Sequence, residues 1–160
     1  KLNNVLVIDI DKNKINIAKK LGYKKSLILK NIKKAKSKNL NFTKNKYFDY
    51  TIDSSGKSKS IEFAFSITRK FGGKCIFASH PNHSSNIKLK PHDLISGKEI
   101  LGSWGGSSDP QKIANYMAPF FLKNKKFLDL YFSKEYPLNN INRAINDFKY
   151  KSSIKLIINY

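Results

Sequence analysis

Residues 4–22 constrain the fold more than any other part of the sequence. Val5–Ile8 is a continuous apolar run, typical of a parallel strand buried on both faces, and it ends at the acid Asp9. A helix is expected directly afterwards, with Asp11 as its N-cap and Gly22 free to take the left-handed conformation that closes it. The apolar residues that recur at helical spacing are Ile15, Ala18 and Leu21. The stretch therefore predicts a buried strand, an acid at its carboxyl end and a helix.

Asp9 is the residue of this stretch with a candidate chemical role. In mononucleotide-binding α/β units, an acid at this place accepts hydrogen bonds from the adenosine ribose hydroxyls of NAD and repels the 2′-phosphate of NADP. Such an acid follows a glycine-rich phosphate turn by about twenty residues, whereas only eight residues precede Asp9. We therefore expect the first strand, glycine turn and first helix of such a unit to be absent. The alternatives are an ordinary strand-end acid and a fold that simply starts with this strand.

Strands and helices are expected to alternate along the rest of the chain. Further strands are predicted at residues 26–29, 47–53, 74–81, 99–104, 127–136 and 154–158, with a short extended piece at 86–89. The strand at 47–53 again ends in an acid, Asp53, and is followed by Ser54, Ser55 and Gly56. Residues 30–46 are expected to form a solvated loop or surface helix. The alternation predicts βαβ units with right-handed crossovers and an α/β fold with a doubly wound, mostly parallel sheet.

The remaining helices are predicted from their apolar spacing. They are expected at residues 57–70, from Pro110 onward until Pro119 ends or kinks the helix, and at residues 138–148. The predicted inward faces of the first and last of these helices are Ile61, Ala64, Phe65 and Thr68, and Ile141, Ala144, Ile145 and Phe148.

Composition limits the class of protein. The 160 residues suffice for one domain with a sizeable core, and neither a membrane-spanning run nor a signal-peptide pattern is present, so we expect a cytoplasmic protein with no membrane partner. The net charge of +20 is carried almost entirely by lysine, with Arg69 and Arg143 as the only arginines, alongside abundant Asn and Ile. This pattern indicates a base-composition bias and argues against specific nucleic-acid recognition, which favours Arg. The lone Cys75 is expected to be a core residue.

Six short motifs in a fixed order carry a resemblance to a known family. They are VIDIDKNKINIAKKLG, FDYTIDSSG, FGGKCIFASHP, ILGSWGG, PLNNINRAINDFK and SSIKLIIN. Together they resemble the C-terminal half of the coenzyme domain of medium-chain, zinc-type alcohol dehydrogenases, over nearly all of residues 4–160. The resemblance implies that residues 1–160 are a partial dinucleotide-binding (Rossmann-like) domain, and that the N-terminal catalytic zinc domain lies outside this chain.

The resemblance also implies the chemistry and its partners. It implies hydride transfer between a small alcohol or carbonyl substrate and NAD, with zinc only on the other domain, no catalytic residue here and no activity of the fragment alone. It further implies a homo-oligomer that pairs through the edge strand at residues 99–103. Its cofactor-binding residues are Asp9, Lys14, Ser54, Ser55, Ala78, Ser79, His80, Trp104 and Lys155.

Each of these residues matches a position with a stated role in the resembling family. Asp9 matches the ribose-binding acid, Lys14 a basic residue beside the adenosine pocket, and Lys155 a position, often Arg, that reaches the pyrophosphate. Ser54 and Ser55 match the loop beneath the coenzyme ribose. Residues 78–80 match the loop that faces the nicotinamide carboxamide, although Ala78 and Ser79 stand where that loop often has glycine. Ser103 and Trp104 match a later backbone contact with the same ring.

Two other functions stay open on the sequence. One is a basic, non-catalytic module that binds nucleic acid, and the other is a zinc-independent oxidoreductase similar to the quinone reductases. A metal site is not expected, because the loop histidines lack an acid or cysteine that would complete a ligand set. These histidines are His80, His83 and His92.

Overall fold

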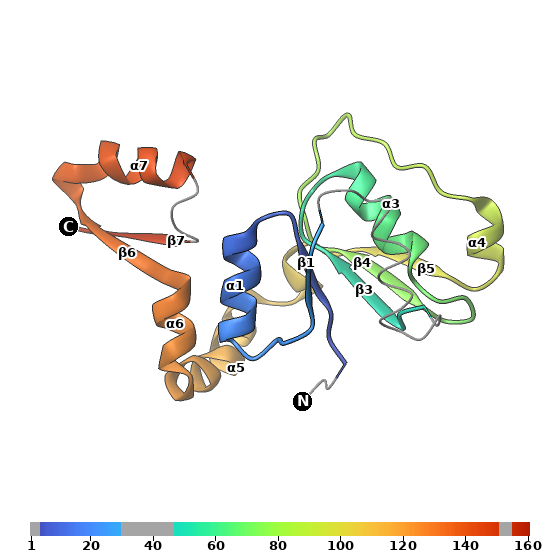
Figure 1. Ribbon diagram of the computed structural model, residues 1–160, viewed down its shortest axis with the longest axis horizontal. Coiled ribbons are helices and arrows are strands. Elements are labelled where there is room, and N and C mark those ends of the chain that lie inside the picture. Colours follow the sequence, from blue (N-terminus) through green and yellow to red (C-terminus); the bar gives the residue numbers. More distant parts are fainter. Residues whose placement is uncertain (1–3, 30–46, 151–154) are drawn as a thin grey trace. The chain divides into compact units, whose positions relative to one another are not determined.

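The computed structural model describes residues 4–29, 47–150 and 155–160 (Figure 1). Contacts divide the chain into two compact units, of which unit 1 spans residues 1–27 and 110–160 and unit 2 spans residues 28–109. The predicted loop or helix at 30–46 lies outside the described residues. Strands and helices alternate as expected, and the described strands fall into three sheets, β1-β2, β3-β4-β5 and β6-β7.

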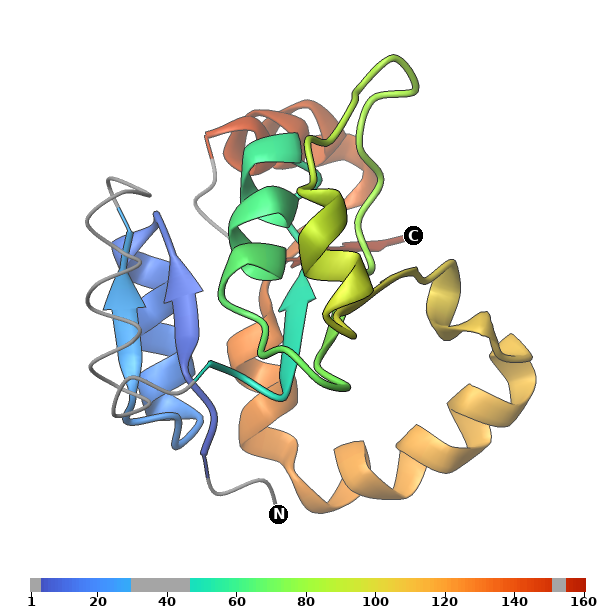
Figure 2. The same cartoon turned by 90° about the vertical axis from the view of Figure 1, so that its right-hand side faces the viewer.

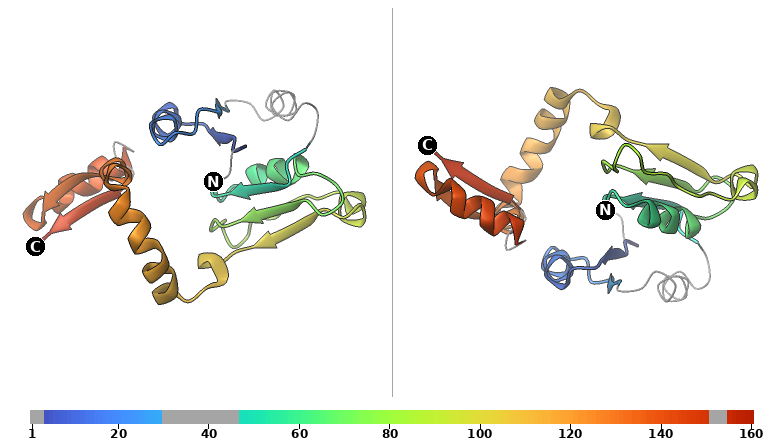
Figure 3. Two further views of the ribbon diagram at one scale, coloured as in Figure 1. Left: turned by 90° about the horizontal axis from the view of Figure 1, so that it is seen from below. Right: turned by 90° about the horizontal axis from the view of Figure 1, so that it is seen from above.

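Unit 2 is built on a three-stranded parallel sheet with the order β3-β4-β5. Helix α3 connects the first two strands and packs against both, on one face of the sheet (Figure 3). In chain order the elements are β3 (Tyr50–Asp53), α3 (Ser58–Ser66), β4 (Lys74–Phe77), α4 (Pro91–Ile95), β5 (Glu99–Gly102) and the 3₁₀ turn η1 (Gly105–Ser107). The extended piece predicted at residues 86–89 is not a strand; the backbone amide of Lys88 donates instead to Glu62 Oε1, at 2.8 Å.

The core of unit 2 lies between α3 and the sheet. The predicted inward face of this helix is confirmed at Ile61, Ala64 and Phe65, whereas Thr68 is buried just beyond the end of α3 at Ser66. Cys75 on β4 is fully buried against this face. Cys75 is a core residue as expected, and burial raises the pKa of its thiol above 9.0.

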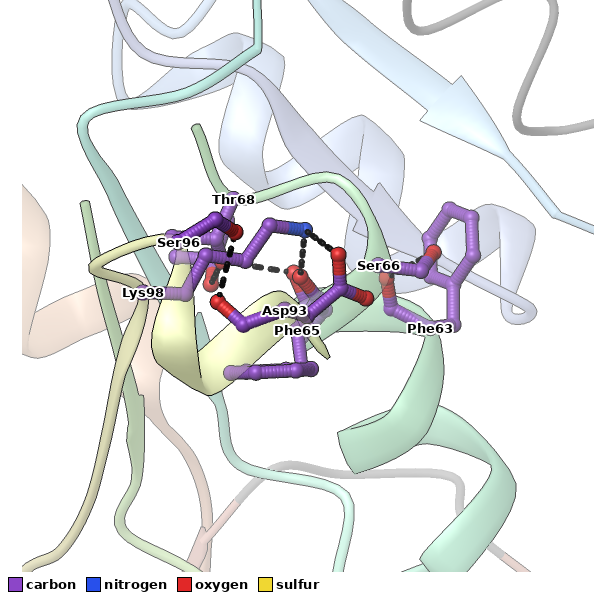
Figure 4. Close-up of polar contacts among 9 residues, drawn as sticks. Phe63, Phe65, Ser66, Thr68, Asp93, Ser96 and Lys98 are labelled. Carbon is purple, nitrogen blue, oxygen red and sulfur yellow. Dashed lines mark hydrogen bonds and ion pairs between the residues drawn. The ribbon is translucent and has the colours of Figure 1, made fainter. Parts of the chain in front are cut away.

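A buried lysine holds α3, α4 and the start of β5 together (Figure 4). Lys98 is only 6% exposed, and its Nζ donates to the carbonyl oxygen of Phe65 at 3.2 Å and lies 3.8 Å from Asp93 Oδ1. The same ammonium lies 5.1 Å from the centroid of the Phe65 ring and 5.5 Å from that of Tyr47. A buried ammonium is costly unless it is paired and hydrogen-bonded, and these partners meet that requirement.

The N-terminal part of unit 1 contains β1 (Val7–Asp9), α1 (Lys12–Lys20) and β2 (Ser26–Ile28). The two strands pair and point in the same direction (Figure 2). As predicted, Asp11 caps α1 by accepting from the backbone amide of Asn13 at 2.7 Å, and Gly22 has a φ of 98°. The buried residues of α1 are Ile15 and Ala18.

The C-terminal part of unit 1 begins with two helices, of which the second differs from the prediction. Helix α5 (Pro110–Lys123) continues past Pro119, so the proline does not end the helix. Residues 127–131, predicted as extended, belong to helix α6 (Lys125–Tyr131). The rings of Phe127 and Tyr131 stack 5.9 Å apart across one helical turn, a contact that favours the helix.

Beyond α6, strand β6 (Phe132–Pro137) pairs in parallel with β7 (Lys155–Asn159). Between these strands the chain forms the turn η2 (Leu138–Asn140) and helix α7 (Ile141–Lys149), which packs on both strands. The predicted inward face of α7 is wrong in part. Of its four residues only Ala144 is buried, whereas Ile141, Ile145 and Phe148 are 41%, 57% and 57% exposed. The described strands that α7 contacts form a pair, and this pair covers only part of the helix's apolar side.

A polar cluster joins β6 to α7. Asp147 Oδ2 accepts a hydrogen bond from the Tyr136 hydroxyl and another from Lys134 Nζ, the latter at 3.0 Å. The hydrogen bond from Tyr136, followed by that from Lys134, lowers the pKa of Asp147, and the same contacts raise the pKa of Tyr136 and Lys134. The cluster is therefore most stable with Asp147 ionised.

Within the described residues, no helix combines the length and the apolar character needed to cross a bilayer.

We predict that Lys98→Ala lowers the free energy of unfolding of unit 2 by roughly 2–4 kcal/mol, because it removes a buried stem and leaves the Phe65 carbonyl without this donor. Lys98→Met keeps most of the stem and is expected to cost less. Urea denaturation of the three proteins measures the difference, with the exposed Lys88→Ala as the control. Equal stability of the Lys98→Ala and Lys88→Ala variants would contradict this role.

We also predict a pH-dependent contribution from Asp147. A lowered folded-state pKa stabilises the fold above the ordinary carboxyl value of 3.8, and the contribution is lost as the pH falls through the lower, folded-state value. Asp147→Asn should therefore weaken β6 and α7 at pH 7, and the difference from the parent should shrink as the pH falls below 3.8. Urea titrations followed by NMR signals of these elements test it. Asp129→Asn is the control, and a difference that is independent of pH would refute the prediction.

Candidate functional site

Three loops meet at the carboxyl edge of the sheet in unit 2. They follow β3 (residues 53–56), β4 (residues 78–80) and β5 (residues 103–104). Because parallel strands end at the same edge, these loops are neighbours although they are far apart in sequence. We call them together the strand-end site. The predicted cofactor-binding residues found in it are Ser54, Ser55, Ala78, Ser79, His80 and Trp104.

A buried carboxylate lies at the centre of the strand-end site. Asp53 is 4% exposed, and its Oδ1 accepts from the hydroxyls of Ser60 at 2.5 Å and Ser55 at 2.9 Å. Its Oδ2 accepts from the Ser79 hydroxyl at 3.0 Å and from the backbone amides of Ser55 at 3.2 Å and Gly56 at 3.4 Å. These donors balance the cost of burying a charge. Asp53 thus ties its own loop to the start of α3 and to the loop after β4.

The first two loops of the site are closely packed at Gly56, where a larger residue would be strained. Gly56 has a φ of 70°, and a Cβ atom there would lie 3.2 Å from the carbonyl oxygen of His80. The backbone amide of Ala78 also donates to the carbonyl oxygen of Asp53, at 2.9 Å. Contacts of three kinds therefore fix one loop against the other: a side-chain hydrogen bond, a backbone hydrogen bond and close backbone packing.

An aromatic pair connects the second loop to the third. The ring centroids of His80 and Trp104 are 4.6 Å apart, and the rings meet edge to face at 84°. Trp104 is nevertheless 81% exposed. Behind the pair, the backbone amide of Ser103 donates to the carbonyl oxygen of Phe77 at 3.0 Å. An indole that is mostly exposed beside an anchored loop offers an apolar surface to a ligand ring.

The other predicted cofactor-binding residues lie in unit 1. Asp9 is half-buried at the end of β1, and its Oδ1 accepts from the backbone amide of Asp11 at 2.8 Å. Its other oxygen, Oδ2, receives no hydrogen bond from the residues that the structure describes. Lys14 is exposed on α1, and Lys155 is exposed at the start of β7. The strand-end site, by contrast, lies entirely in unit 2.

No group of three or more His, Cys, Asp or Glu side chains that could hold a metal ion occurs in the described ranges. His83 and His92 are exposed, and the ring of His80 is engaged with Trp104.

The sequence prediction missed the two residues that organise the strand-end site, Asp53 and Ser60. A signal was present, because an acid that ends a strand and is followed by two serines and a glycine supplies both the carboxylate and its donors. Only Ser55 of that serine pair bonds to the acid. The remaining donors, Ser60 and Ser79, come from residues farther along the chain.

Curated relatives and solved structures show which proteins this chain is similar to. It is 26% identical over 159 residues to alcohol dehydrogenase class-2 isozyme 2 of Oryctolagus cuniculus, covering 99% of the chain and 41% of that protein. It is 27% identical over 159 residues to alcohol dehydrogenase class-3 of Drosophila melanogaster, covering 96% of the chain and 41% of that protein. The chain therefore spans well under half the length of the curated relatives it matches.

The fold is shared with solved dehydrogenase structures. The crystal structure of an alcohol dehydrogenase zinc-binding domain protein from Burkholderia ambifaria superposes with a TM-score of 0.84 at 21% identity, covering 98% of this chain and 41% of that one. This similarity establishes a Rossmann-like α/β fold. In sequence, residues 2–123 match the family model described as zinc-binding dehydrogenase. The match covers most of the chain, which therefore belongs to the zinc-binding dehydrogenase family.

Proposed function

We propose that this chain is the coenzyme-binding part of an NAD-dependent oxidoreductase that resembles the alcohol dehydrogenases and acts within a longer protein. The observation that supports it most strongly is the strand-end site, where three loops are fixed together at the carboxyl edge of a parallel sheet. In open α/β sheets, this edge is where nucleotide ligands bind. The relatives supply the class of reaction, because both are named alcohol dehydrogenases.

The adenosine end of NAD fits Asp9. A ribose diol needs a carboxylate oxygen that can accept its hydroxyls, at the end of a strand. The amide of Asp11 holds Oδ1 and so orients the carboxylate, while Oδ2 has no other donor among the described residues. A fixed negative charge at this place would also repel the 2′-phosphate of NADP. Lys14 and Lys155 are proposed to add positive charge near the adenosine and the pyrophosphate.

The nicotinamide end of NAD fits the strand-end site. Residues 78–80 are proposed to lie along the carboxamide, with Ser54 and Ser55 beneath the neighbouring ribose and Trp104 beside the ring. When bound, NAD accepts the hydride from the alcohol carbon. The described residues orient the ring, because the contacts of Asp53, Gly56 and His80 fix the loops before a ligand arrives.

Catalysis would need groups outside this chain. We propose that the substrate is a small alcohol or carbonyl compound, and that a zinc ion on an N-terminal domain polarises its oxygen. The chain alone is then expected to be inactive. We also propose that β5 pairs with β5 of a second copy of the protein. In the described sheet β5 is an edge strand next to β4, and its residue Leu101 is 43% exposed.

The test measures coenzyme binding by calorimetry. The protein used is this chain extended at its N-terminus by a strand and a glycine-rich turn. We predict that it binds NAD in preference to NADP, and that Asp9→Ala weakens NAD binding by about tenfold or more, which corresponds to roughly 1.4 kcal/mol. The exposed acid Asp109 provides the control variant, Asp109→Ala.

Binding of neither coenzyme by the extended protein would overturn the proposed function. The alternative function, a basic module that binds nucleic acid, would then become the preferred proposal. The 160-residue chain by itself is expected to bind NAD poorly, because its sequence has no G-x-G-x-x-G turn for the pyrophosphate.

A further inference from the structure

We infer that Asp53 makes the Ser79 hydroxyl a hydrogen-bond acceptor for the ligand, so that the strand-end site selects a carboxamide over a carboxylate. Asp53 is in this sense a positioning residue that acts through Ser79. The inference rests on the proposed function, because it concerns the nicotinamide end of the same coenzyme.

The first step is the direction of the hydrogen bond. An ionised carboxylate has no proton to donate, so every group that contacts it must be a donor. The backbone amides of Ser55 and Gly56 can only donate, and they already face Oδ2 of Asp53. The Ser79 hydroxyl donates to the same oxygen at 3.0 Å. Its single proton is therefore committed to Asp53.

The second step is what remains on Ser79. A serine hydroxyl has one proton and two acceptor lone pairs. With the proton directed at Asp53, only the lone pairs are left for a ligand, and Ser79 is half-buried at the edge where its loop begins. A neighbouring group on the ligand must then be an N–H or O–H donor. The amide group of nicotinamide supplies such N–H donors, whereas a carboxylate supplies none.

The third step is electrostatic. Asp53 is buried, so its negative charge is poorly screened by water and acts on whatever lies beside Ser79. An anionic ligand group would meet both this charge and the lone pairs of Ser79. A neutral carboxamide carries no net charge and can donate an N–H to Ser79, so neither repulsion applies to it. Hydrogen-bond direction and charge therefore favour the same ligand.

The experiment compares three ligands on the upstream-extended protein by calorimetry. They are NAD, its nicotinic acid analogue, in which a carboxylate replaces the carboxamide, and ADP-ribose, which lacks the ring. We expect the parent to bind NAD about tenfold or more tightly than the nicotinic acid analogue. Ser79→Ala removes the acceptor, so the affinities for NAD and for the nicotinic acid analogue should become more similar. ADP-ribose should bind the parent and the variant equally, which also shows that both are folded.

Asp53→Asn provides a second, sharper variant. A neutral amide can donate to Ser79 as well as accept, so the serine proton becomes free to face the ligand and the buried charge is lost. The preference for NAD over the nicotinic acid analogue should therefore narrow here too. Asp53→Asn removes the charge as well as freeing the serine proton, so it should reduce the preference for NAD more than Ser79→Ala does. The double variant should reduce that preference no further than Asp53→Asn alone, because the serine then has no additional part to lose. Ser84→Ala is the matched control, since this serine also donates to a side-chain oxygen, Asn82 Oδ1, at 2.9 Å.

The outcomes separate the two proposals. If the parent binds none of the three ligands, the proposed function fails and the inference falls with it. If the parent binds NAD but does not discriminate against the analogue, or if Ser79→Ala leaves the discrimination unchanged, the inference alone is overturned. A general loss of stability would weaken ADP-ribose binding equally and would not change the ratio.

Discussion

The hydrogen bonds of the buried Asp53 carboxylate determine how the functional edge of unit 2 is assembled. Burying a charge costs free energy, and the cost is balanced only if donors reach both oxygens. Here Ser55 and Gly56 come from the loop after β3, Ser60 from the first turn of α3, and Ser79 from the loop after β4. One charge thus fixes a helix start and two loops. Removing any donor leaves the charge less well satisfied, so these segments depend on one another.

The sequence predicted the elements whose signals are local. The strand–acid–helix unit ending at Gly22 is an example, because capping by Asp11 and the apolar spacing of α1 need no distant partner. The prediction failed where neighbours decide the outcome. Residues 127–131 read as a strand but form a helix, in which the Phe127 and Tyr131 rings stack. The exposed face of α7 depends on how much sheet covers the helix, which its spacing cannot show.

The candidate site was predictable as a set of loops but not as a set of contacts. A parallel sheet brings the ends of its strands to one edge, so the loops after β3, β4 and β5 are expected to be neighbours. Asp53 joins the first two loops, and the His80–Trp104 pair joins the last two. The contact between Asp53 and Ser79 follows from the register, in which Asp53 lies opposite Phe77 and Ser79 comes two residues later. The register between two strands cannot be derived from the sequence of either strand alone. The sequence alone therefore identifies Asp53 only as the last residue of a strand.

Asp9 and Asp53 show why a strand-end acid is not by itself a sign of ligand binding. Both are the last residue of a short strand and precede a turn that leads into a helix. Asp9 is half-buried and the amide of Asp11 occupies one of its oxygens, so the other can serve a ligand. Asp53 is buried and both of its oxygens accept from hydroxyl and amide donors, so it serves the protein. The difference lies in the residues that follow, since a serine-rich turn satisfies an acid that an Ile–Asp turn leaves partly open.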